Sequence, residues 1–297
     1  MSLTTFTASL PVRALFNKTA VGIPKGHFND PILIDHADKN KASLVGTAVD
    51  YMIRILLARY AKEKGIQAHS DGYVAWLAIV KAKDSGHDKL AADLSEIAGK
   101  CEGIFDGIIN RTYTGRHGFV DACYRMAKLD VVGRVGPHYL DGIHGHLLPG
   151  HQDYDVFKEI LQFIDVVNVE KAFAPKQNIL LNPSFQHSLA VDGADADVVV
   201  DDTLFEIKTT SQNTLHRHYF EQLAGYAALA EIGGFSLLID NQRQTITSVP
   251  IRNFGLFFPR QDLKLVYPIS ELFGMFGWEE YVSGFRSLLK LETSHAA

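Results

Sequence analysis

The stretch GADADVVVDDTLFEIKTT, residues 193–210, constrains the fold of this chain more than any other. Two short runs rich in β-branched and aromatic residues flank Asp201 and Asp202, and such a pair of turn-forming residues predicts a tight β-hairpin. A two-residue turn fixes the register of the two strands, so Asp197 should lie opposite Glu206. The sequence therefore predicts an antiparallel strand pair with acidic residues at its open end.

The predicted register brings acidic side chains and a lysine onto one face of the hairpin. Paired residues, and residues two apart along a strand, point to the same face, so Asp197, Glu206 and Lys208 should converge. Asp195 shares this face and is the reserve for Asp197. Carboxylate oxygens at this spacing can hold Mg²⁺ or Mn²⁺, with the carbonyl oxygen of Ile207 as a further ligand. Such a cation activates water and neutralises charge on a phosphate, while a lysine orients or deprotonates the water.

An ordinary surface hairpin would account for the same residues without any ligand. Acidic residues and lysines often face each other across exposed strands as simple ion pairs. The following helix favours the first interpretation, because EQLAGY places Gln222 and Tyr226 one turn apart on one face. Both could face the metal site and contact a phosphate or a base, although a helical tyrosine more often only packs.

These motifs, taken in order, resemble the PD-(D/E)XK nuclease superfamily and, within it, the RecB-like nucleases. Those proteins carry an aspartate ahead of a short strand, (D/E)-x-K on the next strand and Gln-x-x-x-Tyr on the helix after it. The matching residues are Asp197, EIK at 206–208 and QLAGY at 222–226, and the resemblance covers residues 185–270 and, more loosely, residues 44–60. It implies an α/β fold with a restriction-endonuclease-like core, in which a mixed central sheet is flanked by helices.

The resemblance also implies an activity and a role for each residue. The protein would be a Mg²⁺- or Mn²⁺-dependent nuclease that hydrolyses phosphodiester bonds in single- or double-stranded DNA, in repair, recombination, phage or defence processes. Asp197 and Glu206 would hold the metal and Lys208 would orient the water. Gln222 and Tyr226 would position the substrate.

One position departs from the pattern of these nucleases. Their earlier core helix often carries a histidine ligand shortly after a glycine, whereas the matching helix here, VGTAVDYMIR, has Asp50. A carboxylate still binds Mg²⁺ or Mn²⁺, so Asp50 could complete the site. Alternatively, Asp50 is an exposed helical residue, and the protein has a nuclease fold that binds nucleic acid or a protein partner without cutting.

Hydrophobic periodicity divides the chain into three parts that form one composite domain. Residues 1–64 comprise an N-terminal segment that is irregular, with at most a short helix near residues 11–17, and then the first core helix. Residues 65–175 show helical spacing typical of a large helical insertion. Residues 176–297 predict three strands, a helix, two strands and a last helix from about residue 278. The two strands after the helix should join around residues 260–262, and Arg260, at a strand end near the predicted site, is a residue to test.

Composition excludes several classes of protein. Two cysteines, Cys101 and Cys123, are too few for an iron–sulfur cluster, and each lies in an apolar helical pattern typical of the core. A net charge of −5 provides no overall basic surface for nucleic acid, although a local basic groove is compatible with it. The sequence shows no signal peptide and no long apolar span, so we expect a cytoplasmic protein without a membrane partner.

Two histidine-rich segments are further candidates. Residues 137–153, PHYLDGIHGHLLPGHQD, suggest zinc, but they lack HExxH or a cysteine partner, and their glycines and prolines favour a polar loop. His216, Arg217 and His218 precede the helix of Gln222, where cations could meet phosphates. A solvated start of that helix is an equally good interpretation.

Overall fold

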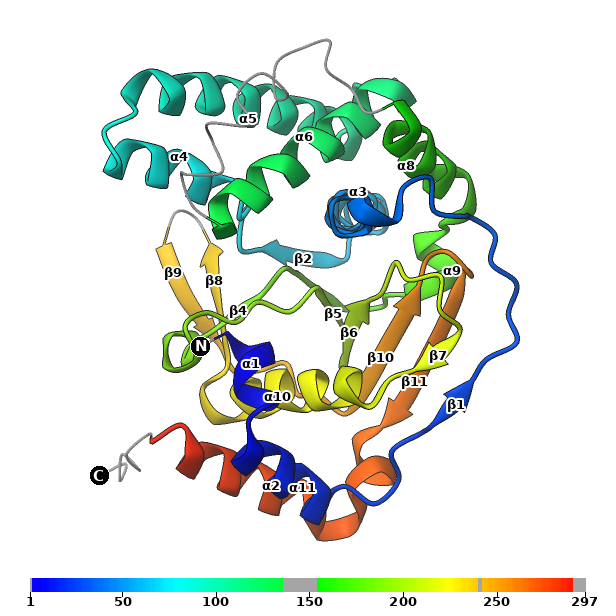
Figure 1. Cartoon of the computed structure of the whole chain (residues 1–297), viewed down its shortest axis with the longest axis vertical. Coiled ribbons are helices and arrows are strands. Elements are labelled where there is room, and N and C mark those ends of the chain that lie inside the picture. Colours follow the sequence, from blue (N-terminus) through cyan, green and yellow to red (C-terminus); the bar gives the residue numbers. More distant parts are fainter. Residues whose placement is uncertain (1, 136–153, 240–241, 291–297) are drawn as a thin grey trace.

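A mixed six-stranded sheet forms the centre of the computed structural model, which describes residues 2–135, 154–239 and 242–290 (Figure 1). The strands follow the order β11 (Leu263–Pro268), β10 (Asn253–Phe258), β6 (Thr203–Ile207), β5 (Val198–Val200), β3 (Asn178–Leu181) and β2 (Gln67–Ser70). The strands β3, β5 and β6 form an antiparallel meander, and β10 is parallel to β6. The predicted α/β fold with a mixed sheet and a helical region is confirmed.

The hairpin of β5 and β6 has the predicted register. Val200 pairs with Thr203, and the two strands are joined through Asp201 and Asp202. Asp201 adopts a positive φ of 55°, a left-handed conformation that aspartate tolerates better than most residues. Its carboxylate accepts hydrogen bonds from the backbone N–H groups of residues 176–178. The same residue thus turns the chain and fixes the entry into β3.

Helices cover both faces of the sheet (Figure 1). One face carries α3 (Ala42–Lys64), α4 (Trp76–Asp84), α5 (Asp88–Ile109), α6 (Arg116–Val135), α8 (Tyr154–Val166) and α9 (Val169–Phe173). The other face carries α1 (Leu3–Thr7), α2 (Leu10–Thr19), α10 (Arg217–Gly233) and α11 (Ile269–Leu288). Alternation along β5 and β6 separates two hydrophobic cores: Val198 and Phe205 face α3, whereas Val199 and Leu204 face α10.

Several further short elements accompany the main sheet and its helices. The remaining elements are β1 (Gly26–His27), β4 (Ser184–Phe185), β7 (Thr214–Leu215), β8 (Phe235–Ile239), β9 (Gln242–Ile246) and the 3₁₀ turns Lys39–Lys41 and Ser188–Val191. The short helix expected near residues 11–17 is present as α2, whose first turn contains Pro11, a position where proline is tolerated, whereas α1 was not expected. The last helix begins at Ile269, before the predicted position, and bends at Gly274.

The strand β2 lies within the segment that was expected to be a helical insertion. It pairs in parallel with β3 at the edge of the main sheet, so the core sheet begins before residue 176. Three residues of β2 are exposed and only His69 is half-buried. The sequence therefore shows no apolar alternation that would identify this strand. The helical region proper starts after this strand.

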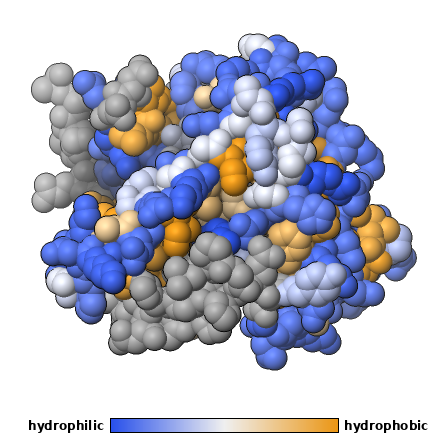
Figure 2. All heavy atoms as spheres, turned by 90° about the horizontal axis from the view of Figure 1, so that it is seen from above, coloured by the Kyte–Doolittle hydropathy of each residue, from blue (hydrophilic) through white to orange (hydrophobic). Residues whose placement is uncertain are grey.

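The surface and the cysteines agree with the composition. Figure 2 shows one largely hydrophilic face on which apolar side chains form small, separate groups. Cys101 and Cys123 are buried and free, as the helical pattern predicts. None of the helices in the described ranges is long and apolar enough to cross a bilayer.

Replacing Gly255 by alanine should destabilise the sheet beside the hairpin. Gly255 lies next to Phe205 on the parallel strand, and an added Cβ would come within 2.2 Å of the buried Phe205 ring. Displacing such a ring typically costs about 1–3 kcal/mol, measurable as a lower free energy of unfolding in urea. Gly103→Ala is the control, because its Cβ would meet no described atom within 4 Å and alanine favours a helix. Equal stability of the two variants would contradict this packing.

Candidate active site

The hairpin brings the predicted acidic residues and lysine together. Asp197 immediately precedes β5, Glu206 lies within β6 and Lys208 follows it. The backbone N–H of Ile207 donates a hydrogen bond of 2.6 Å to Oδ2 of Asp197. The Nζ atom of Lys208 donates to Oε1 of Glu206 at 2.5 Å. The predicted shared face is therefore present, and the main chain holds one carboxylate in place.

The helix α10 adds its glutamine to this group. Lys208 Nζ lies 3.4 Å from Oε1 of Gln222, and Nε2 of Gln222 donates to the Tyr226 hydroxyl at 3.0 Å. The Tyr226 ring stacks on Phe185, and only 7% of the residue is exposed. Burial raises the pKa of Tyr226 well above its usual value. Tyr226 thus fixes the side chain of Gln222 from the buried side of α10. The substrate contact predicted for Tyr226 stays a prediction.

Asp50 approaches the site from α3. Its Oδ2 accepts a hydrogen bond of 2.6 Å from Arg54, and its side chain is 19% exposed. The interpretation of Asp50 as an exposed surface residue is therefore wrong. Burial raises the pKa of Asp50 to about 6, opposed by Arg54 and reinforced by the charges of Asp130 and Asp195. The carboxylate lies in a low-dielectric region that already contains other acids.

The charges of the site influence one another strongly. Burial raises the pKa of Asp197 well above its usual value, and the charges of Glu206 and Asp50 raise it further. Burial opposes the charge of Lys208, but Glu206 and Asp197 outweigh this effect and raise its pKa. Lys208 is therefore cationic at neutral pH, which suits it to orient a water or a phosphate oxygen.

Two buried carboxylate oxygens provide the test of whether a metal fits. Oδ1 of Asp50 and Oε2 of Glu206 have no hydrogen-bond partner within residues 2–135, 154–239 and 242–290. An unpaired buried acceptor is costly, and hard oxygen donors are the ligands that Mg²⁺ and Mn²⁺ prefer. The donor set therefore fits a divalent cation in its chemistry.

The same carboxylates are also engaged by groups of the protein itself. Among the described residues, no three or more His, Cys, Asp or Glu side chains are already arranged around a common metal position. One oxygen each of Asp50, Asp197 and Glu206 is taken by Arg54, the Ile207 N–H and Lys208. Metal binding requires these side chains to reorient, and the ligand roles of Asp50, Asp197, Glu206 and the Ile207 carbonyl stay predictions.

The reserve residue Asp195 points toward the helical region. Its Oδ2 lies 3.3 Å from a guanidinium nitrogen of Arg134 on α6, which also bonds to Asp130. Asp130 in turn accepts a hydrogen bond of 3.3 Å from the Tyr51 hydroxyl on α3. Asp195 thus joins the hairpin to the helical region, and it is less suited than Asp197 to bind a metal.

Sequence reasoning missed several charged and aromatic neighbours of the site. Arg54 had a signal, because it follows Asp50 by four residues on one helical face. Tyr219, whose ring lies 5.0 Å from Lys208 Nζ, follows the histidine pair and could have been found with it. Arg134 is 61 residues from Asp195 and had no local signal. The zinc candidate at 137–153 lies outside the described residues.

No family model, curated protein or solved structure matches this chain. The resemblance to RecB-like nucleases consequently stays a prediction. What supports it is the order in which the fold presents its motifs. An aspartate precedes β5, a glutamate and a lysine accompany β6, and a glutamine and a tyrosine share one face of α10.

Proposed function

We propose that this protein is a Mg²⁺- or Mn²⁺-dependent nuclease that hydrolyses phosphodiester bonds in DNA. The observation that carries the proposal is the convergence of Asp197, Glu206 and Lys208 at one end of the hairpin, with a buried oxygen of Glu206 left unpaired within the described part of the chain. Asp50 and Gln222 approach the same point from α3 and α10. Phosphodiester hydrolysis needs carboxylates, a cation and a positioned donor in such an arrangement.

Each residue has a separate task in this proposal. Asp197, Glu206, Asp50 and the Ile207 carbonyl would hold the cation, which supplies an activated water and neutralises charge on the phosphate. The protonated Nζ of Lys208 donates to the attacking water or to a phosphate oxygen. The side-chain oxygen of Gln222 accepts a hydrogen bond from Lys208 and so orients its Nζ, and the buried Tyr226 hydroxyl fixes the amide of Gln222.

The direct test is a cleavage assay with purified protein on linear and circular DNA, each single- and double-stranded. We expect cleavage with Mg²⁺ or Mn²⁺ and none with a chelator. Attack on linear DNA alone indicates an exonuclease, and attack on circles indicates an endonuclease. Cleavage that persists in the chelator, or no cleavage of any substrate with either metal, would contradict the proposal.

A second candidate function has its own support. Glu206 and Asp50 each already bind a cationic side chain, Lys208 and Arg54, so the acids are neutralised without a metal. A protein of this kind would bind nucleic acid or a protein partner without cutting. Calorimetry distinguishes the two, because tight DNA binding without any heat of Mn²⁺ binding would favour the non-cutting protein.

A further inference from the structure

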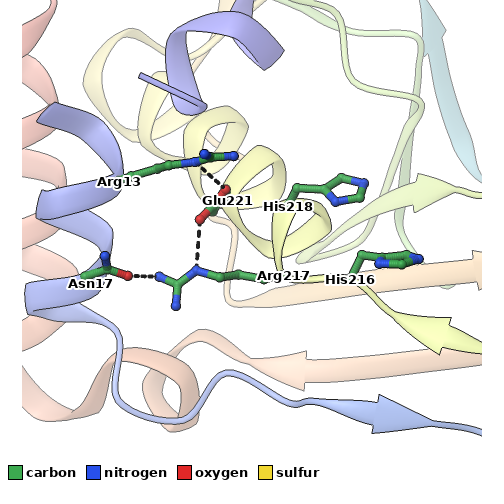
Figure 3. Close-up of a pocket in the computed structure, with 6 residues that line it drawn as sticks. All are labelled: Arg13, Asn17, His216, Arg217, His218 and Glu221. Carbon is green, nitrogen blue, oxygen red and sulfur yellow. Dashed lines mark hydrogen bonds and ion pairs between the residues drawn. The ribbon is translucent and has the colours of Figure 1, made fainter. Parts of the chain in front are cut away.

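A cavity of about 520 Å³ opens at the start of α10. It is lined by residues of two helices that are distant in sequence, namely Arg13, Asn17, His216, Arg217, His218 and Glu221 (Figure 3). Four of the six are arginines or histidines. The two arginines outweigh the single carboxylate of Glu221, so the cavity carries a net positive charge on a protein whose overall net charge is −5.

A buried carboxylate fixes the two arginines of the cavity. The Nε of Arg217 donates to one oxygen of Glu221 at 2.9 Å, and the Nε of Arg13 lies 3.5 Å from the other oxygen. The Glu221 side chain is 6% exposed, whereas those of Arg13 and Arg217 are 48% and 39% exposed. Asn17 accepts a further hydrogen bond from Arg217. Two guanidinium groups are thus held in place around one negative charge, with their outer parts open to solvent.

The histidines connect this cavity to Lys208. Figure 3 shows that their rings extend from the start of α10 on the side away from the Arg217 guanidinium. The two rings stack at 5.3 Å, and the Tyr219 ring lies 4.4 Å from that of His218 and 5.0 Å from Lys208 Nζ. A single aromatic ring therefore separates Lys208 from the histidine pair.

The titration of His218 agrees with a positive field along this line. Burial lowers its pKa, the charges of His216 and Lys208 lower it further, Glu221 opposes this shift, and Arg13 makes a smaller lowering contribution. His218 is thus within the electrostatic reach of both the candidate active site and the arginine pair. The lowered pKa leaves His218 neutral at neutral pH, so the cationic groups along this line are Arg13, Arg217 and Lys208, which attract the phosphates of a nucleic acid strand.

We propose that the cavity of Arg13 and Arg217 binds one phosphate of the nucleic acid strand of which another phosphate faces Lys208. The inference rests on the proposed function, because it assigns the substrate path of that site. The planar guanidinium forks suit phosphate oxygens, and Glu221 orders them before the ligand arrives. The contact positions the strand and reads no base.

The experiment measures binding of a short single-stranded oligonucleotide by fluorescence anisotropy, with chelator present so that no cleavage occurs. Arg13→Gln should weaken binding roughly tenfold, since one charged contact is lost. The slope of log affinity against log salt should fall by about 0.7, the value for one phosphate on a single strand. Arg217 remains as a partner for buried Glu221, so the variant should fold.

Lys18→Ala is the matched control. Lys18 lies on the same helix, its side chain is 70% exposed, and it pairs with Glu280 outside the cavity. Unchanged affinity and salt slope in Arg13→Gln, or the same loss in Lys18→Ala, would overturn the assignment. Two oligonucleotides, one with a 5′-phosphate and one with a 5′-hydroxyl, show whether the cavity binds the terminal phosphate of a strand or an internal one. A preference for the 5′-phosphate that Arg13→Gln removes indicates a terminal phosphate, and equal losses indicate an internal one.

The outcomes also separate this inference from the nuclease proposal. If the wild-type protein never cleaves but its binding depends on Arg13, the nuclease proposal fails and the phosphate site stands. If the wild-type protein cleaves with metal while Arg13→Gln keeps both its affinity and its KM, the phosphate site fails and the nuclease stands. Asp197 and Glu206 are unchanged in every variant of this test.

Discussion

Lys208→Ala is expected to reduce metal-dependent cleavage of DNA by about 10²–10⁴-fold, the range that loss of one electrostatic or proton-transferring group produces. The lysine is the cationic side chain bonded to both Glu206 and Gln222, and its own side chain is 20% exposed. Its removal leaves the buried carboxylate of Glu206 without its cationic partner, so we expect some loss of stability beside the loss of cleavage. Initial rates on linear DNA with Mn²⁺ or Mg²⁺, together with a circular dichroism spectrum, measure both effects.

Two further measurements distinguish this loss from other causes. Lys264→Ala removes an exposed lysine from the edge strand β11 and should leave the rate unchanged. Calorimetry should still detect Mn²⁺ binding to Lys208→Ala, because Asp197, Glu206 and Asp50 remain. Wild-type rates in the lysine variant would assign the activity to a contaminant or to another site. Loss of Mn²⁺ binding as well would show that Lys208 supports the metal site and not the water.

The hairpin could be predicted from the sequence because a two-residue turn leaves little freedom of register. Once Asp201 and Asp202 form the bend, the pairing of Val200 with Thr203 follows, and the positions of Asp197 and Glu206 follow from it. The motif pair on α10 was equally local, since residues four apart share a helical face. Most of the candidate site could be predicted from the sequence because its residues fall within one short segment, 197–226.

The missed elements lacked a local signal. The strands β2 and β9 consist mainly of exposed polar residues, and their backbone pairing with β3 and β8 leaves no apolar alternation to detect. The contribution of Asp50 depends on where α3 crosses the sheet, which no spacing within the chain reveals. The hydrogen bond from Gln222 to Tyr226, in contrast, joins residues whose spacing predicts contact, but only burial shows that the tyrosine faces the core.

Arg260 has a structural role that the sequence does not reveal. Its position at the end of β10 suggested only a residue worth testing near the site, yet it is completely buried. Its guanidinium donates to the carbonyl oxygens of Thr209 and Ile34, to Nδ1 of His36 and to the buried carboxylate of Glu159. One side chain thus joins the exit of β6, the N-terminal segment and α8, over separations of 51 to 226 residues.

Arg260→Met should therefore lower the free energy of unfolding by about 3–5 kcal/mol, because it leaves the charge of Glu159 buried without its partner. Urea unfolding followed by circular dichroism measures the loss.

The pair Arg111 and Glu63 is the matched control: the Arg111 side chain is 68% exposed, so Arg111→Met should leave the free energy of unfolding nearly unchanged. The double variant Arg260→Met with Glu159→Leu should recover part of the loss, since it removes both buried charges together. If Arg260→Met were no less stable than Arg111→Met, the buried network could not be what holds the segment after Lys208 in position, and the geometry of the candidate site would need another support.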